Sequence, residues 1–144
     1  MGDFGYCGVR SGLPFTPTVS GDNSGTGQSR DRPNQIADPR LPSSERTVQR
    51  YFRTEAFAQP ARGTFGNAGR NQMTGPGQRN LDVSLSKRMQ LGEQKAMQIR
   101  VEFFNALNTP TFFLPNGVSN TSNFGRIFQA EDARQIQLGA KINF

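Results

Sequence analysis

The feature that most constrains the fold is a strict alternation of apolar and polar side chains in the second half of the chain. In residues 81–91 every odd position is apolar except Lys87, and every even position is polar. The segments 97–107 and 135–144 repeat this pattern with small interruptions. Successive side chains of a strand point to opposite faces of a sheet, so a period of two predicts strands with one apolar and one polar face.

The length of these segments separates them from the strands of soluble domains, which usually run about 5–6 residues. We expect strands at about 79–91, 96–107 and 132–144. A strand of about 12 residues extends roughly 40 Å and, tilted by about 45°, rises about 28 Å, close to the roughly 25 Å apolar band of an outer-membrane barrel. Hydrophobic residues make up only 33% of the chain, which is little for a soluble core.

The pattern also predicts how the first two of these strands pair. Both carry their apolar residues at odd positions, so odd must pair with odd, and the connection must hold three or five residues. We expect three, Gly92–Gln94, because five would place Arg88 directly opposite Arg100, and like charges destabilise a sheet.

The predicted fold is therefore all-β, a fragment of an antiparallel transmembrane β-barrel with about four long strands. The first strand is expected at about 4–19, and long loops at about 20–78 and 108–131. Such barrels have short periplasmic turns and longer extracellular loops, so we expect both loops to be extracellular. A loop as long as 20–78 is expected to be either functional or disordered.

The polar face of the strands would line the lumen of the barrel, and for Arg100 and Glu102 a solvated wall network is favoured over a substrate path. The lumen-facing candidates are Arg88, Gln98, Arg100, Glu102, Gln135, Gln137 and Lys141. Lys87 is expected near the periplasmic interface, where its ammonium group can reach water. A bulge that turns Lys87 into the lumen is the alternative. Four aromatic residues are expected in the interfacial belts: Phe103, Phe112, Phe113 and Phe144.

Catalytic, metal and cofactor chemistry is not expected. The chain has no histidine and one cysteine, Cys7, which argues against zinc sites, Cys–His nucleophile pairs and internal disulfides. The spacing of Asp22, Asp31 and Asp38 does not match a calcium loop. The net charge of +6 comes from scattered basic residues rather than from a basic helix or sheet motif, so no nucleic-acid partner is expected. The glycines of residues 63–71 are expected to supply positive φ in a surface loop.

The last eight residues resemble the C-terminal assembly signal of outer-membrane barrels. The matching positions are Gln137, Gly139, Ile142 and Phe144, with a departure at Ile142, where an aromatic residue is more common. This resemblance implies the barrel-assembly machinery as a partner. An amphipathic strand that merely happens to end the chain is the other interpretation.

A longer resemblance is to the C-terminal region of TonB-dependent receptors, in particular the carboxypeptidase-regulatory-like type with an Oar-like barrel. The resembling segments, in family order, are SGLPFTP (11–17), DRPNQIADP (31–39), GTFGNAGRNQMTGPGQRNLDVSLSK (63–87), RVEFFNALNTPTFFLPN (100–116), FGRI (124–127) and ARQIQLGAKINF (133–144). The resemblance implies a larger protein with a signal peptide, a regulatory-like domain, a plug and a barrel of about 22 strands. This chain would carry only its last strands.

The expected function follows from this resemblance. The chain would be the C-terminal portion of a TonB-dependent receptor or transporter in the outer membrane of a Gram-negative-type bacterium, and would contribute barrel wall and extracellular loops for substrate uptake. Its partners would be outer-membrane lipid, the assembly machinery, the rest of its own barrel and plug, and TonB only through the part outside this chain. The alternative is a soluble or surface-attached β-rich module that binds an acidic partner. A third possibility is that several copies of the chain together close one barrel.

Overall fold

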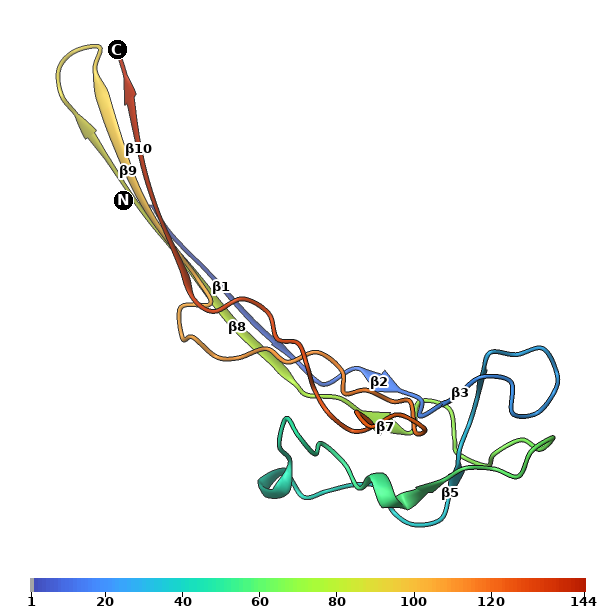
Figure 1. The fold of residues 1–144 in the computed structure, drawn as a ribbon. Coiled ribbons are helices and arrows are strands. Elements are labelled where there is room, and N and C mark those ends of the chain that lie inside the picture. Colours follow the sequence, from blue (N-terminus) through green and yellow to red (C-terminus); the bar gives the residue numbers. More distant parts are fainter. Residues whose placement is uncertain (1) are drawn as a thin grey trace. The chain divides into compact units, whose positions relative to one another are not determined.

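The computed structural model describes residues 2–144, which form two compact units. The sheet unit contains residues 2–11, 77–111 and 130–144, and the loop unit contains residues 12–76 and 112–129. Within residues 2–144 the regular elements are strands and two short 3-10 turns, so the fold is all-β (Figure 1). No helix of this part of the chain is long and apolar enough to cross a membrane.

The sheet unit is one antiparallel sheet with the strand order β1-β8-β9-β10. Its strands are β1 (Gly2–Arg10), β8 (Gln78–Gln90), β9 (Ala96–Phe104) and β10 (Gln135–Asn143). The 13 residues of β8 extend about 43 Å at about 3.3 Å per residue. The sheet is open, with β1 and β10 at its two edges.

The hairpin between β8 and β9 has the predicted three-residue connection. The Leu91 N–H donates to the Lys95 carbonyl at 2.8 Å, which leaves Gly92–Gln94 between the paired residues. Arg88 lies opposite Gln98, and Arg100 lies opposite Ser86. The sheet thus avoids the Arg88–Arg100 pairing, and the prediction of odd-with-odd pairing is confirmed.

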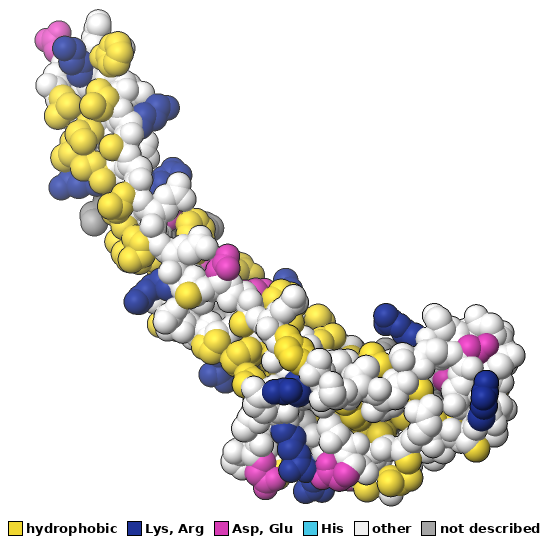
Figure 2. Space-filling view, viewed as in Figure 1, with side chains coloured by type: hydrophobic (Ala, Val, Ile, Leu, Met, Phe, Trp, Pro, Cys, Tyr) yellow, Lys and Arg dark blue, Asp and Glu magenta, His cyan; other side chains and the backbone are white. Residues whose placement is uncertain are grey.

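The register collects the apolar side chains on one face of the sheet. Leu85 pairs with Val101, and Val101 pairs with Leu138 of β10. Figure 2 shows hydrophobic side chains following the long strands. They are not covered, since Leu138 has 76% of its surface exposed. Lys87 lies on this face opposite Ile99 in an unbroken ladder, so the alternative of a bulge at Lys87 is wrong.

The strands end earlier than the sequence pattern suggests. The strand expected at 4–19 stops at Arg10, and just beyond it the backbones of Gly12 and Gly75 approach closely, since a Cβ on Gly12 would lie 1.8 Å from the Gly75 carbonyl oxygen. The strand expected at 96–107 stops at Phe104, since Asn105 adopts φ 50° and its side chain accepts a hydrogen bond from the Thr109 N–H at 3.0 Å. The strand expected at 132–144 begins at Gln135.

The loop unit contains several short elements in place of a long irregular loop. Its strands pair as two-residue ladders, and its two turns are short 3-10 segments. They are β2 (Pro14–Phe15) with β7 (Met73–Thr74), β3 (Val19–Ser20) with β4 (Arg30–Asp31), β5 (Asn34–Gln35) with β6 (Phe57–Ala58), η1 (Ser43–Glu45) and η2 (Thr54–Ala56). Residues 20–78 are therefore folded in this structure and not disordered.

An aromatic cluster forms the core of the loop unit. Phe52 is 1% exposed, and its ring centroid lies 6.0 Å from that of Phe15, 6.1 Å from Phe57 and 5.0 Å from Phe124. Edge-on and tilted aromatic pairs at these distances add to the free energy gained from burial. Phe112 packs against the same core, and its expected place in an interfacial belt stays a prediction.

The two chain segments of the loop unit are joined by backbone hydrogen bonds as well. The Tyr51 N–H donates to the Gly125 carbonyl at 2.9 Å, the Ile127 N–H to the Val48 carbonyl at 2.8 Å, and the Ser119 N–H to the Thr18 carbonyl at 2.7 Å. Residues 12–76 and 112–129 therefore fold as one body, although they connect different pairs of strands.

Two glycines of residues 63–71 have different roles in this unit. Gly63 has φ +79°, as expected for a glycine in a surface turn. Gly66 instead permits a close approach, because a Cβ there would lie 2.1 Å from the Arg32 carbonyl oxygen. The expectation of positive φ is thus met by Gly63, while Gly66 is required by packing.

The hairpin register can be tested with disulfides in a Cys7→Ala background. Because Leu91 and Lys95 are a hydrogen-bonded pair, alternation makes Arg88 and Gln98 a non-hydrogen-bonded pair, with Cα atoms about 4.5 Å apart. We expect Arg88→Cys with Gln98→Cys to oxidise readily in detergent, measured by mass spectrometry of tryptic peptides. Arg88→Cys with Arg100→Cys is the matched control, and preferential oxidation of that pair would contradict the register.

The aromatic core can be tested by comparing two Phe→Ala substitutions. Phe52→Ala should lower the free energy of unfolding of the loop unit by about 3–5 kcal/mol, as is typical for a buried Phe. Phe65→Ala, at a side chain that is 65% exposed, should have little effect. Native-state hydrogen exchange of the loop-unit amides measures both, and equal losses in the two variants would show that Phe52 does not anchor the core.

Candidate functional site

The seven lumen-facing candidates all lie on one face of the sheet. The register places Arg88, Gln98 and Lys141 in one row across β8, β9 and β10. Glu102 and Gln137 form another row, with Arg100 between these rows and Gln135 beyond them. The structure therefore brings together residues that are up to 53 positions apart, from Arg88 to Lys141. Whether this face lines a lumen stays a prediction.

An ion pair and an open position mark the centre of the polar face. The Arg100 Nη1 lies 3.7 Å from the Glu102 Oε1, and the Arg100 side chain is about half exposed. Gly139 is paired with Arg100, and a Cβ at Gly139 would meet no atom within 4 Å. These residues border a shallow depression that is lined by Gln98, Arg100, Glu102, Gln137, Gly139, Ala140 and Lys141. Its side chains supply hydrogen-bond donors and acceptors to water or to a polar solute.

The polar face also contains residues that the sequence pattern did not single out. Tyr6 of β1 lies opposite Asp82 of β8, and Phe104 of β9 lies opposite Gln135. Asp82 accepts a hydrogen bond from the Asn105 N–H at 2.9 Å, which ties β8 to the end of β9. The glycines of β1 interrupt its alternation, so only the pairing with β8 could reveal that Tyr6 shares this face.

The residues of the expected assembly signal are distributed over β10 and its end. Gln137 and Gly139 lie on the polar face, and Ile142 lies on the apolar face opposite Met97. Phe144 follows the last residue of β10 and is 96% exposed. This geometry leaves Phe144 accessible, and its role in assembly stays a prediction.

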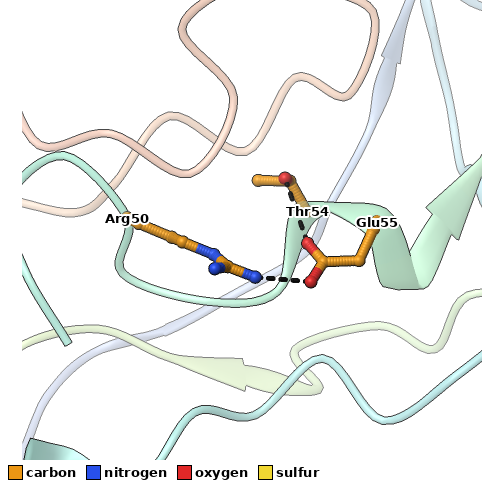
Figure 3. Close-up of polar contacts among 3 residues, drawn as sticks. All are labelled: Arg50, Thr54 and Glu55. Carbon is orange, nitrogen blue, oxygen red and sulfur yellow. Dashed lines mark hydrogen bonds and ion pairs between the residues drawn. The ribbon is translucent and has the colours of Figure 1, made fainter. Parts of the chain in front are cut away.

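Two carboxylates of the loop unit are held in the charged form. The hydrogen bond from the Gly27 N–H, at 2.7 Å, is the main cause that lowers the pKa of Asp22 below its ordinary value, and the Thr26 N–H adds to it. A hydrogen bond from its own backbone N–H lowers the pKa of Glu55, with a further contribution from the Arg50 charge. Figure 3 shows Glu55 between Arg50 and Thr54.

Of the three aspartates considered for calcium binding, Asp22 and Asp31 lie near each other, since the Ser24 hydroxyl hydrogen-bonds to both, whereas Asp38 shares no hydrogen-bond partner with them. Asp31 is buried and accepts hydrogen bonds from the Ser24 N–H and hydroxyl, whereas the Asp22 carboxylate is filled by backbone N–H groups. Asp38 accepts a hydrogen bond from the Arg40 N–H. Among residues 2–144, no group of three or more acidic, Cys or His side chains is placed to hold a metal ion.

Comparison with known proteins agrees with this geometry. Residues 5–137 match the family described as outer membrane beta barrel domain. The match covers most of the sheet unit and the whole loop unit. Searches of curated proteins and of solved structures give no match.

The family match is consistent with the long amphipathic strands, whose length and alternation suit a barrel wall. The match extends well beyond half of the chain, and it assigns the chain to the outer membrane. The chain therefore belongs to the outer-membrane β-barrel domain family.

Proposed function

We propose that the chain is the C-terminal portion of a TonB-dependent receptor or transporter in the outer membrane of a Gram-negative-type bacterium. In this proposal β1, β8, β9 and β10 contribute barrel wall, and the loop unit contributes part of the extracellular substrate-binding surface. Energy coupling to TonB would reside in a plug outside this chain. The chain itself carries no catalytic step in this proposal.

The uncovered apolar face of the sheet is the observation that supports the proposal most. Leu85, Ile99 and Leu138 remain exposed on a face that is continuous from β8 to β10. A soluble protein rarely leaves such a strip of apolar side chains in water, while lipid covers it without cost. The opposite face carries the charged and amide side chains expected of an aqueous lumen.

The connectivity of the strands is consistent with a receptor. The β8–β9 turn is short, and both segments of the loop unit begin and end at the other end of the sheet. In outer-membrane barrels the long loops are extracellular, which would place the loop unit outside the cell. A folded body there could capture a substrate before transport.

The two open edges of the sheet indicate that further strands are needed to complete a barrel. β1 and β10 each present a row of backbone N–H and C=O groups without a neighbouring strand in residues 2–144. Membrane strands must satisfy these groups by closure, since lipid offers no hydrogen bonds. The rest of the barrel would supply the closing strands, and the barrel-assembly machinery would join them, with Gln137, Gly139, Ile142 and Phe144 as its recognition residues. A soluble module for an acidic partner would not need long strands with an apolar face.

The receptor assignment can be tested at the native locus with an epitope inserted at Gly25, an exposed glycine with φ +75°. We expect the tagged product to be far larger than the 15.9 kDa of this chain, to fractionate with the outer membrane and to cross-link to TonB. Immunoblotting after formaldehyde cross-linking measures these properties. A tonB deletion strain is the control for the cross-link. A 15.9 kDa product that never cross-links to TonB would contradict the receptor assignment.

The membrane requirement of the sheet can be tested with the chain alone. Produced without the rest of a barrel, it should aggregate in detergent-free buffer, because two sheet edges and an apolar face are exposed. Detergent should restore a dispersed form, as judged by analytical ultracentrifugation. A stable monomer without detergent would instead favour the soluble binding module.

A further inference from the structure

A pocket in the loop unit combines arginine side chains with a floor of buried apolar side chains. It is lined by Arg40, Leu41, Arg46, Tyr51, Phe52, Gln72, Met73 and Thr74, and has a volume of about 110 Å³. Leu41, Phe52 and Met73 are buried, and the last two belong to the aromatic core. The floor of the pocket is therefore part of the best-packed region of this unit.

Arg46 is held in one orientation by two contacts. Its Nε donates to the Leu41 carbonyl at 2.9 Å, and its guanidinium carbon lies 5.4 Å from the centroid of the Tyr51 ring. A guanidinium has five N–H donors, and the Nε bond uses one of them. The terminal Nη groups thus remain able to bind a planar oxyanion with two parallel hydrogen bonds.

The positive charge of the pocket is not neutralised within the described part of the chain. Neither Arg40 nor Arg46 has an ion pair there, in contrast to Arg50, which Glu55 engages (Figure 3). No Asp or Glu lines the pocket. Two unpaired guanidinium groups at one small pocket raise the local concentration of anions.

Gln72 also lines the pocket and has a polar atom without a partner. The Gln72 Oε1 accepts a hydrogen bond from the Gly69 N–H at 3.0 Å, which fixes the orientation of the amide. The Gln72 Nε2 is then buried and has no hydrogen-bond partner in residues 2–144. A buried donor without an acceptor costs free energy, and an acceptor brought by a ligand or by water relieves this cost.

We propose that this pocket binds a small organic oxyanion. The carboxylate or phosphate group of the ligand pairs with Arg40 and Arg46, and its apolar part contacts Leu41 and Met73. The volume of about 110 Å³ is smaller than that of pockets for drug-sized ligands, and it suits a small oxyanion or the end group of a larger molecule. As a capture site for uptake, the pocket rests on the proposed function; as a binding site, it depends only on the loop unit.

The test uses the full chain in detergent micelles, labelled with ¹³C at the methionine methyl groups. Met73 lines the pocket, while Met89 and Met97 pair with each other on the sheet and serve as internal controls. The probes are benzoate, phenyl phosphate and the neutral benzyl alcohol. We expect either anion to shift the Met73 resonance to saturation, with Met89 and Met97 unchanged and benzyl alcohol without effect. The more tightly bound anion distinguishes carboxylate from phosphate recognition.

Matched variants connect the binding to the arginines. Arg40→Gln should weaken the anion by about tenfold, since a charge-assisted hydrogen bond is lost. Arg70→Gln removes the same charge from the loop unit outside the pocket and should change the affinity by less than about twofold. Gln72→Glu keeps the acceptor for the Gly69 N–H but adds a negative charge, so it should also weaken binding.

Three results would overturn the proposal: no anion-dependent shift of Met73, an equal shift with benzyl alcohol, or equal losses in Arg40→Gln and Arg70→Gln. An equal movement of Met89 and Met97 would likewise show partition into the micelle. Failure here leaves the TonB cross-link unaffected, and failure of the cross-link leaves the Met73 titration unaffected. The two proposals are therefore tested separately.

Discussion

The pairing of the long strands is the constraint on which the sheet unit depends. Because side chains alternate along a strand, a slip of one residue between β8 and β9 would move every apolar side chain of one strand to the opposite face. The three-residue connection Gly92–Gln94 prevents this slip, and the pairing of Val101 with Leu138 extends the same faces to β10. One local turn therefore determines which side chains form the apolar face of the sheet and which form its polar face.

The loop unit is stabilised in a different way. It has only two-residue ladders, so its order comes from the cluster around Phe52 and from hydrogen bonds between the two segments. Aromatic side chains bury a large area for each residue, which lets a segment rich in glycine and proline fold around few apolar groups. The same rigid cluster supplies the floor of the arginine-lined pocket. Phe52 and Met73 thus both pack the core of the loop unit and line the pocket.

The strands and the hairpin register of the sheet could be predicted from the sequence, because the alternation of apolar and polar residues is a local pattern. The alternation in residues 81–91 and the charges of Arg88 and Arg100 were enough to predict the hairpin register, and the polar-face candidates do share one face. The close contact between Gly12 and Gly75, just beyond β1, was not accessible, since it joins residues far apart in the sequence. The same holds for the loop core, because Phe52 and Phe124 are far apart in sequence and no periodic pattern relates them.

The union of residues 12–76 and 112–129 has a consequence for the evolution and engineering of this protein. The two segments share backbone hydrogen bonds, such as that from Tyr51 to Gly125, and a common core. If one segment were replaced by a segment with a different backbone path, backbone groups of the other would be left unpaired. Recombination that changes ligand preference through a new loop backbone would therefore have to transfer both segments together. The two segments would then be inherited as one unit.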